Sequence, residues 1–282
     1  MRHKKDRISS TSAATHTITT QPGSVAAGQI QAAQRDAALS LKHEVNFHDI
    51  LKDGSPGPEM VVIPPGTFLM GSPDAEHERA EDEHQHAITI GHPFAMGRYA
   101  VTFAEYDAFC DATGQKKPLD MGWGREQHPV INVTWNDALD YCEWLYIQTG
   151  HSYWLPTEAE WEYCCRAGTT TPFYFGSSLS PTQAHYEDDH ISKTQAVGNL
   201  PPNALGLYEM HGNVWEWTCS EYEKDYRGAE TECSQSKYDL GLRVYRGGSW
   251  LNKPTWLRSA ARSHRNPGHR HHNLGFRLTM MF

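Results

Sequence analysis

Three threonine-led motifs determine where helices can begin in this chain. Each places a threonine three residues ahead of an acid, in Thr102-Phe103-Ala104-Glu105, Thr134-Trp135-Asn136-Asp137 and Thr157-Glu158-Ala159-Glu160. The threonine oxygen can accept a hydrogen bond from a free N–H of the first turn, and the acid complements the helix dipole. We therefore expect helices to start at these three motifs.

Apolar residues at helical spacing follow the first two motifs and predict a buried face on each helix: Tyr106, Phe109 and Cys110, then Ala138, Cys142 and Leu145. Gly114 is a stop signal for the first helix. Met60–Ile63 and Thr67–Met70 read as strands, and beyond Gly168 the chain is punctuated by glycine, proline and asparagine. A few helices among many short strands and loops indicate an α+β domain.

The N-terminal part is polar and is predicted to lie outside the folded domain. Residues 1–45 are rich in Ser, Thr, Gln, Ala and His, so they cannot bury enough surface to offset their ordering entropy, although Ala26–Leu41 could form a polar helix. We predict a mostly disordered tail and linker over residues 1–58 and a folded domain over residues 59–282. The basic start is followed by polar residues, so no signal peptide is predicted.

The composition excludes two classes of partner. With 38% apolar residues and no apolar run long enough to cross a bilayer, no membrane span is predicted. A net charge of −9 argues against a general nucleic-acid binder. The charge is uneven, because residues 74–86 are acidic while residues 258–277 hold five arginines, four histidines and no carboxylate. That basic tail predicts a surface for an anionic or polar partner, and a solvated face explains it equally well.

The six cysteines form no CxxC pair and so no metal-type pattern. Nucleophilic catalysis by cysteine needs a thiolate near a base or a metal ion. Cys219 and the vicinal pair Cys164 and Cys165 are the candidates, but no motif singles them out, and we expect them to be small buried apolar residues. A reducing cytoplasm fits this pattern.

Five motifs in order carry a family resemblance: Pro156-Thr157-Glu158-Ala159-Glu160-Trp161-Glu162-Tyr163, Gly212-Asn213-Val214-Trp215-Glu216-Trp217, Gly247-Gly248-Ser249-Trp250, Arg258-Ser259-Ala260-Ala261-Arg262-Ser263 and Asn273-Leu274-Gly275-Phe276-Arg277. Residues 59–282 thereby resemble the formylglycine-generating enzyme, or sulfatase-modifying factor, family. The resemblance implies a C-type-lectin-like α+β fold with few helices, short strands and much irregular loop.

The chain departs from this family where the family's chemistry resides. The resemblance implies a copper-holding cysteine pair after Gly-Gly-Ser, but here residues 251–257 contain no cysteine and the last cysteine is Cys233. We therefore predict that copper does not bind and that sulfatase cysteines are not oxidised. The family's disulfide partners of Cys142 and Cys165 would fall at Leu278 and Ser259, so those bridges cannot form.

The resemblance also implies a structural calcium ion. Its oxygen ligands fall on Glu209, Gly212, Val214 and Glu216, and hard oxygen ligands suit Ca²⁺. Alternatively, Glu216 only accepts backbone hydrogen bonds in a tight turn. The histidines of the tail invite a transition-metal interpretation, but none shows a spacing with a clear mechanism, and a histidine-rich surface loop is the more common outcome.

The tail further resembles the variable proteins of diversity-generating retroelements, in which adenine-rich codons are randomised to make new binding surfaces. We predict that the segment from about residue 244 to 277 recognises an unknown protein or small-molecule ligand, with Gly247, Gly248, Trp250, Arg258, Gly275 and Phe276 holding the backbone beneath it. The candidate ligand-binding residues are Leu251, Asn252, Lys253, Thr255, Trp256, His264, Arg265, His269, His271 and His272. The chain is thus predicted to be a ligand-binding or display protein. The alternatives are a divergent formylglycine-generating-type or nonheme-iron oxidoreductase and a regulatory scaffold domain.

Overall fold

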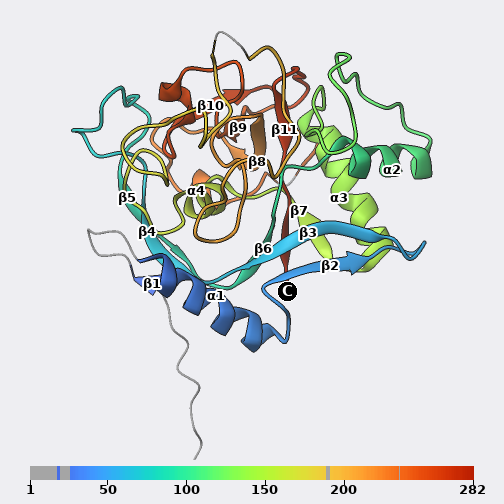
Figure 1. Cartoon of the computed structure of the whole chain (residues 1–282), viewed down its shortest axis with the longest axis horizontal. Coiled ribbons are helices and arrows are strands. Elements are labelled where there is room, and N and C mark those ends of the chain that lie inside the picture. The colour runs from blue at the N-terminus through green and yellow to red at the C-terminus, as the bar shows by residue number, and fades with distance from the viewer. Residues whose placement is uncertain (1–17, 20–25, 189–190, 235) are drawn as a thin grey trace, which may run out of the picture.

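Two main sheets form the centre of the molecule, with α2 (Phe103–Thr113) and α3 (Trp135–Thr149) at the right and α1 (Ala27–Leu41) below them (Figure 1). A computed structural model describes residues 18–19, 26–188, 191–234 and 236–282. The five-stranded sheet has the order β2-β3-β6-β12-β7 and the four-stranded sheet the order β10-β9-β8-β11, while β1, β4 and β5 form a third, small sheet. The strands are β1 (Ile18–Thr19), β2 (Asn46–Ile50), β3 (Pro56–Ile63), β4 (Gly66–Met70), β5 (His86–Ile90), β6 (Phe94–Gly97), β7 (Ser152–Trp154), β8 (Trp215–Glu221), β9 (Arg243–Arg246), β10 (Arg262–Arg265), β11 (Leu274–Phe276) and β12 (Thr279–Met281).

Capping boxes start three of the helices, as the sequence predicts. The helices are α1 (Ala27–Leu41), α2 (Phe103–Thr113), α3 (Trp135–Thr149) and α4 (Glu158–Arg166), with short 3-10 turns at Ala229–Thr231 (η1) and Pro254–Leu257 (η2). Thr102, Thr134 and Thr157 each accept a hydrogen bond from the acid three residues on, and that acid's carboxylate accepts one from the threonine N–H. Gly114 ends α2 in the left-handed conformation, with φ 74°.

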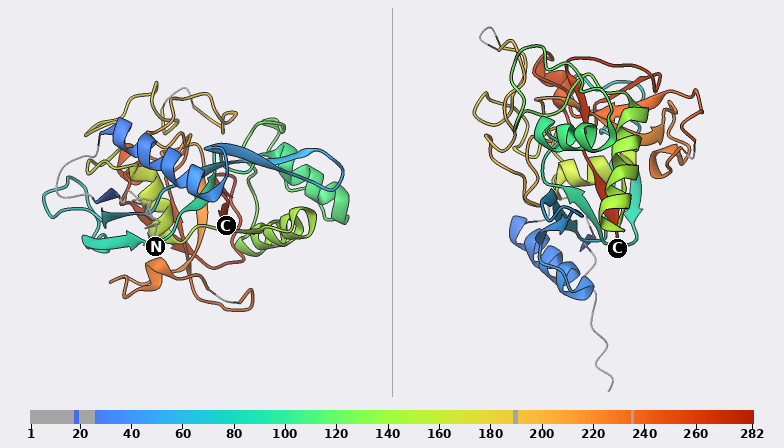
Figure 2. Two further views of the ribbon diagram at one scale, coloured as in Figure 1. Left: turned by 90° about the horizontal axis from the view of Figure 1, so that it is seen from below. Right: turned by 90° about the vertical axis from the view of Figure 1, so that its right-hand side faces the viewer.

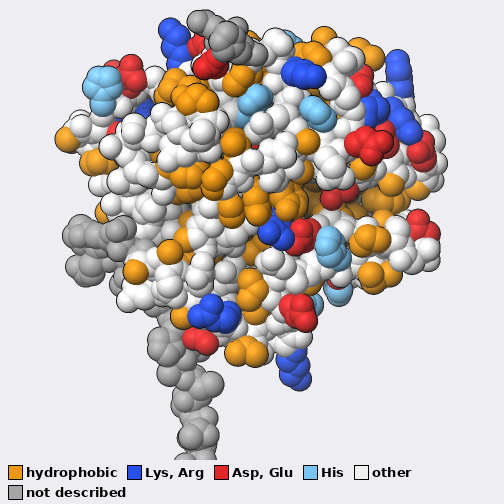
Figure 3. Space-filling view, viewed as in Figure 1, with side chains coloured by type: hydrophobic (Ala, Val, Ile, Leu, Met, Phe, Trp, Pro, Cys, Tyr) orange, Lys and Arg blue, Asp and Glu red, His pale blue; other side chains and the backbone are white. Residues whose placement is uncertain are grey.

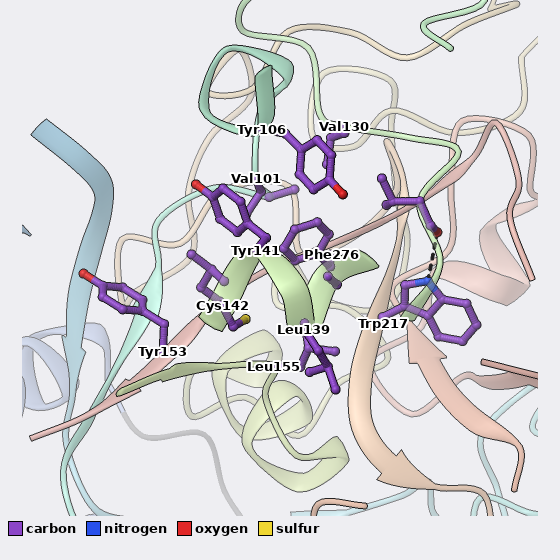
Figure 4. Close-up of a cluster of buried hydrophobic side chains, with 14 of the residues drawn as sticks. Val101, Tyr106, Val130, Leu139, Tyr141, Cys142, Tyr153, Leu155, Trp217 and Phe276 are labelled. Atoms are coloured by element: carbon purple, nitrogen blue, oxygen red, sulfur yellow. Dashed lines mark hydrogen bonds between the residues drawn. The ribbon is translucent and has the colours of Figure 1, made fainter. Parts of the chain in front are cut away.

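The apolar core joins α2 and α3 to the C-terminal strands. Figure 4 shows Tyr106, Tyr141 and Phe276 facing one another, with the Phe276 ring centroid 5.7 Å from that of Tyr141. Trp217 is fully buried nearby, and its indole N–H donates to the carbonyl of Val133 (Figure 4). Edge-to-face aromatic packing of this kind adds about 0.5–1.5 kcal/mol per pair beyond burial. The core therefore anchors β8 and β11, which carry cleft residues described below.

The N-terminal segment from residue 26 is packed against the domain, unlike the mostly disordered tail predicted for residues 1–58. The right-hand view of Figure 2 shows α1 lying below the sheets. Ile30 is buried, and Gln34 Nε2 donates to the carbonyls of Val62 and Leu205. Small alanines let the helix approach β3 closely, so few large apolar residues are needed to bury it. Residues 1–17 and 20–25 lie outside the described residues.

The strand nearest the C-terminus completes the five-stranded sheet from the inside. β12 pairs antiparallel with both β6 and β7, and Thr279 lies opposite Met96 on one side and Trp154 on the other. Removing β12 would leave two strands without a shared partner.

Candidate ligand-binding cleft

A cleft of about 420 Å³ opens against the four-stranded sheet, each strand of which contributes to its lining. It is lined by Trp215, Tyr245, Asn252, Trp256, Ser263, Arg265, His269, His271, Asn273 and Leu274. Five of these are among the ten ligand-binding candidates predicted from the sequence, namely Asn252, Trp256, Arg265, His269 and His271. The tail thus gathers half of its candidates around one concave surface.

Aromatic side chains form one wall of the cleft. The Trp215 ring meets Tyr245 edge to face at 5.0 Å and Trp256 at 6.3 Å between centroids. Trp215 is 5% exposed and Trp256 is 47% exposed, so the wall has a fixed inner ring and an accessible outer one. An exposed tryptophan over a buried one is a surface suited to a planar ligand.

A polar network forms the floor. The indole N–H of Trp215 donates to Asn252 Oδ1 at 2.8 Å, and the Ser249 hydroxyl lies 2.5 Å from the same oxygen. Asn273 Nδ2 donates to Ser249 Oγ at 2.9 Å, and Asn273 Oδ1 lies 2.5 Å from Nδ1 of His271. Ser249 and Asn273 are buried, so these bonds hold the floor in one arrangement.

The formal charge of the cleft is positive, because its lining includes Arg265 and no aspartate or glutamate. Arg265 is exposed and donates to the carbonyl of its neighbour His264. Burial and then the nearby charge of Arg265 hold the pKa of His269 below its usual value. Figure 3 shows histidine side chains scattered among hydrophobic and charged ones on the upper part of the face seen in Figure 1.

The other five candidates do not line the cleft. Leu251 and Lys253 are exposed beside it. Thr255 donates its hydroxyl proton to Glu78 Oε2 at 2.6 Å, and His264 stacks on Tyr222 with ring centroids 3.7 Å apart. His272 packs against Trp123 and Trp250 at 5.7 Å in each case. His264 alternates with the cleft residues Ser263 and Arg265 along β10, so the ten candidates do not all share one surface.

The backbone beneath the cleft depends on glycines with positive φ. Gly247 and Gly248 have φ values of 101° and 71°, which only glycine adopts without strain. A Cβ on Gly248 would also lie 2.6 Å from the Leu257 side chain. Trp250, Arg258 and Phe276, which the sequence predicts to support the surface, are buried.

Most arginines of the basic tail point inward. Fewer of them are therefore available to bind an anionic partner at the surface than the composition of the tail predicts. Arg258 pairs with Glu83 and Glu76 of the acidic segment. Arg262 pairs with Glu158 on α4. The uneven charges of the sequence therefore neutralise one another inside the protein, and Arg265 is left beside the cleft.

The predicted calcium ligands have protein partners. Glu216 accepts from Arg277 Nη2 at 2.8 Å and from the Trp161 indole N–H at 2.7 Å. Glu209 accepts from the N–H of Gly198 at 3.0 Å, and burial raises the pKa of Glu209. As they lie here, the two carboxylates do not form an oxygen cage, since a calcium ion would have to displace Arg277 from Glu216. Calcium at Glu209, Gly212, Val214 and Glu216 stays a prediction.

The cysteines lie away from the cleft. Cys219 and Cys233 form a disulfide, which corrects the expectation that Cys219 is a free buried residue and is the arrangement expected in an oxidising compartment. Cys165 Sγ lies 3.7 Å from Ser259 Oγ, where the family resemblance places a disulfide partner, and 3.8 Å from both His211 nitrogens. Burial raises the pKa of Cys165 to about 12 and lowers that of His211 to about 3. Both groups are neutral at pH 7, so this pair is not an activated thiolate.

The described residues contain neither a metal-binding cluster nor a membrane-spanning helix. No group of three or more His, Cys, Asp or Glu side chains that could hold a metal ion occurs in the part of the chain the structure describes. Within the same residues, no helix has the length and apolar character needed to cross a bilayer.

The fold is that of a C-type-lectin-like domain of the formylglycine-generating type. The family model described as the sulfatase-modifying factor enzyme 1-like domain matches residues 46–281. The formylglycine-generating enzyme of Bos taurus is 29% identical, with 86% of this chain and 80% of that protein covered. This chain belongs to the sulfatase-modifying factor family.

Solved structures agree on the fold. The structure of PvdO from Pseudomonas aeruginosa is 36% identical, with a TM-score of 0.76 over 84% of this chain and 98% of that one. The variable protein 1 of Treponema denticola is 22% identical, with a TM-score of 0.66 over 84% of this chain and 99% of that one, and its likeness concerns the fold alone.

Proposed function

We propose that this chain is a ligand-binding member of the sulfatase-modifying factor family, with the cleft of the C-terminal segment as its recognition site. The observation that carries this proposal is the convergence of Asn252, Trp256, Arg265, His269 and His271 on one cavity of about 420 Å³. That volume lies within the range of small-molecule sites, which bury most of a ligand against apolar walls with a few polar groups.

The chemistry of the lining favours a planar ligand that carries an anionic group. Trp256 offers an exposed flat apolar surface backed by the buried rings of Trp215 and Tyr245, and Arg265 is an exposed cation in a lining without carboxylates. A guanidinium group pairs well with a carboxylate or phosphate, and tryptophan and arginine dominate binding hot spots.

Calorimetric titration with 2-naphthoate and with neutral 2-naphthamide tests this proposal. We expect saturable binding of the carboxylate and a loss of about tenfold or more in Trp256→Ala, which corresponds to about 1.4 kcal/mol. Arg265→Gln should weaken the carboxylate more than the amide. Lys253→Ala is the matched control, because Lys253 is exposed near the cleft but does not line it. Equal binding by Trp256→Ala and the unchanged protein would refute the proposal.

A second and more specific proposal is that the C-terminal segment, from about residue 244 to 277, is diversified by a retroelement. It rests on the tail, where residues typical of altered asparagine codons alternate with Gly-Gly-Ser-Trp and Gly-Phe-Arg. A reverse transcriptase gene near this gene, with a near-copy of the segment that differs only at adenines, is the expected finding. A locus without such a copy contradicts diversification and leaves the cleft proposal intact.

The cytoplasmic location stays a prediction. The Cys219–Cys233 disulfide weighs against it, because structural disulfides persist mainly in oxidising compartments. Fractionation of the native host, with alkylation of free thiols before lysis, decides between the cytoplasm and an oxidising compartment.

A further inference from the structure

The hydrogen-bond network under the cleft has a direction, which begins at Trp215. An indole N–H can only donate. The Asn252 side-chain atom that lies 2.8 Å from it must therefore be the amide oxygen. This contact fixes the orientation of the Asn252 amide without further assumption.

The direction passes through Ser249 to Asn273. Because Asn252 Oδ1 only accepts, the Ser249 hydroxyl at 2.5 Å must donate its single proton to it. Ser249 Oγ is then left to accept, and it does so from Asn273 Nδ2 at 2.9 Å. The Asn273 amide is thereby oriented with its oxygen toward His271.

This orientation determines the tautomer of His271. Asn273 Oδ1 accepts, so the His271 nitrogen 2.5 Å away, Nδ1, must carry a proton. In the neutral imidazole the lone pair then lies on Nε2, on the side of the ring away from the buried network. Among the described residues Nε2 has no hydrogen-bond partner, and His271 lines the cleft.

We propose that His271 is the proton acceptor of the cleft. Its Nε2 takes a proton from a bound planar ligand that carries a weakly acidic O–H and an anionic group. This inference rests on the proposed ligand-binding function and names its chemistry. The ligand's O–H bond breaks, an Nε2–H bond forms, and the products are an oxyanion and an imidazolium. Asn273 Oδ1 continues to accept from Nδ1–H in both states, so the network need not rearrange.

The surroundings of His271 bear on this transfer. The His269 ring lies nearly parallel to that of His271 with centroids 6.0 Å apart, and the His272 ring is 4.1 Å away. Arg265 lines the same cleft and offers the cation that an oxyanion requires. The groups shown against or beside this ring include His269, His272 and Arg265, and each is positive when ionised.

Nitrogen NMR of protein labelled with ¹⁵N-histidine tests the tautomer without any ligand. We expect neutral His271 to carry its proton on Nδ1 and to show an unprotonated Nε2. Asn273→Ala should lose this preference, whereas His272→Gln should leave it unchanged. A proton on Nε2 of His271 in the unchanged protein would overturn the assignment.

The second measurement uses 4-hydroxy-3-nitrobenzoate, whose colour reports ionisation of its phenol, and 3-nitrobenzoate, which lacks the phenol. We expect the first probe to bind as phenolate at a pH where it is mostly phenol in solution, and to bind as phenol to His271→Gln. A probe that stays a phenol when bound to the unchanged protein overturns the proton transfer. Failure of both probes to bind would count against the ligand-binding function, while the tautomer measurement still decides the state of His271.

Discussion

Arg258 and Glu83 are 175 residues apart in the chain, and the two terminal guanidinium nitrogens donate to the two carboxylate oxygens at 2.7 Å each. Both side chains are buried, and Arg258 also donates to Glu76. Breaking a buried pair leaves an uncompensated charge, so we expect Arg258→Met to lower the free energy of unfolding by about 3–5 kcal/mol. Arg258→Lys should recover little, because an ammonium group cannot make the bidentate contact.

Urea unfolding measures this loss, with Arg227→Met as the matched control. Arg227 pairs with Asp225 at the surface, so its loss should cost about 0–1 kcal/mol. Similar costs for the two variants would contradict the role given to Arg258.

The same pair predicts an acid-sensitive contribution to stability. Burial raises the pKa of Glu83, but the hydrogen bonds and charge of Arg258 outweigh it and leave the pKa below its usual 4.5. Stability from this carboxylate is therefore present above about pH 4.5 and is lost as the pH falls through the folded pKa. The penalty of Glu83→Gln should be large at pH 7 and shrink below pH 4.5. Exposed Glu81→Gln should cost little at either pH, and a pH-independent penalty at Glu83 would refute the linkage.

The cysteine arrangement predicts a specific thiol count. Four free thiols are expected after denaturation of oxidised protein without reductant. Cys219→Ala should raise the count to five by releasing Cys233, whereas without a disulfide it would lower the count from six to five. In the folded protein these thiols should react slowly, because Cys165 is buried and its pKa is raised to about 12.

Calcium at the predicted ligands would appear as a gain in thermal stability. If the prediction holds, calcium should raise the melting temperature relative to EGTA, since a ligand bound only to the folded state stabilises it. Glu216→Gln and Glu209→Gln should each remove that rise. A melting temperature independent of calcium would exclude the site and leave Arg277 as the cation that balances Glu216.

The absence of cysteine after Cys233 predicts no copper-dependent oxidation. Soft thiolates are the ligands that hold Cu(I), and none follows the Gly-Gly-Ser motif. Incubation with copper and a sulfatase-derived cysteine peptide should leave the peptide's mass unchanged. A formylglycine-generating enzyme serves as the positive control, and sustained conversion by this chain would contradict the prediction.

Local chemistry explains what could be predicted from the sequence. The capping boxes of α2, α3 and α4 each involve residues that are three apart in the chain, so a single short motif predicts where each helix starts. Trp256 and His271 belong to one candidate segment and both line the cleft, although Thr255 and His264 of the same segment do not. By contrast, Arg258 pairs with Glu83, and Gln34 bonds Val62 and Leu205, across distances that no local pattern encodes.

The missed members of the cleft show the same limit. Trp215 and Asn273 stand in the family motifs, and Tyr245 precedes one, but the sequence alone did not indicate that they face a cavity. Their place depends on the parallel pairing of β11 with β8, which sets Leu274 opposite Trp215. The direction of the Ser249–Asn273 bond, and with it the tautomer of His271, appears only once these strands are paired.

The place of β12 between β6 and β7 has a consequence for biosynthesis. The apolar side chains of β6 emerge from the ribosome long before residues 279–281 have been made. At usual elongation rates the delay is on the order of ten to forty seconds. During that time β6 and β7 have no shared partner, so the nascent chain exposes strand edges that chaperones bind. The five-stranded sheet can therefore close only after residues 279–281 have been synthesised.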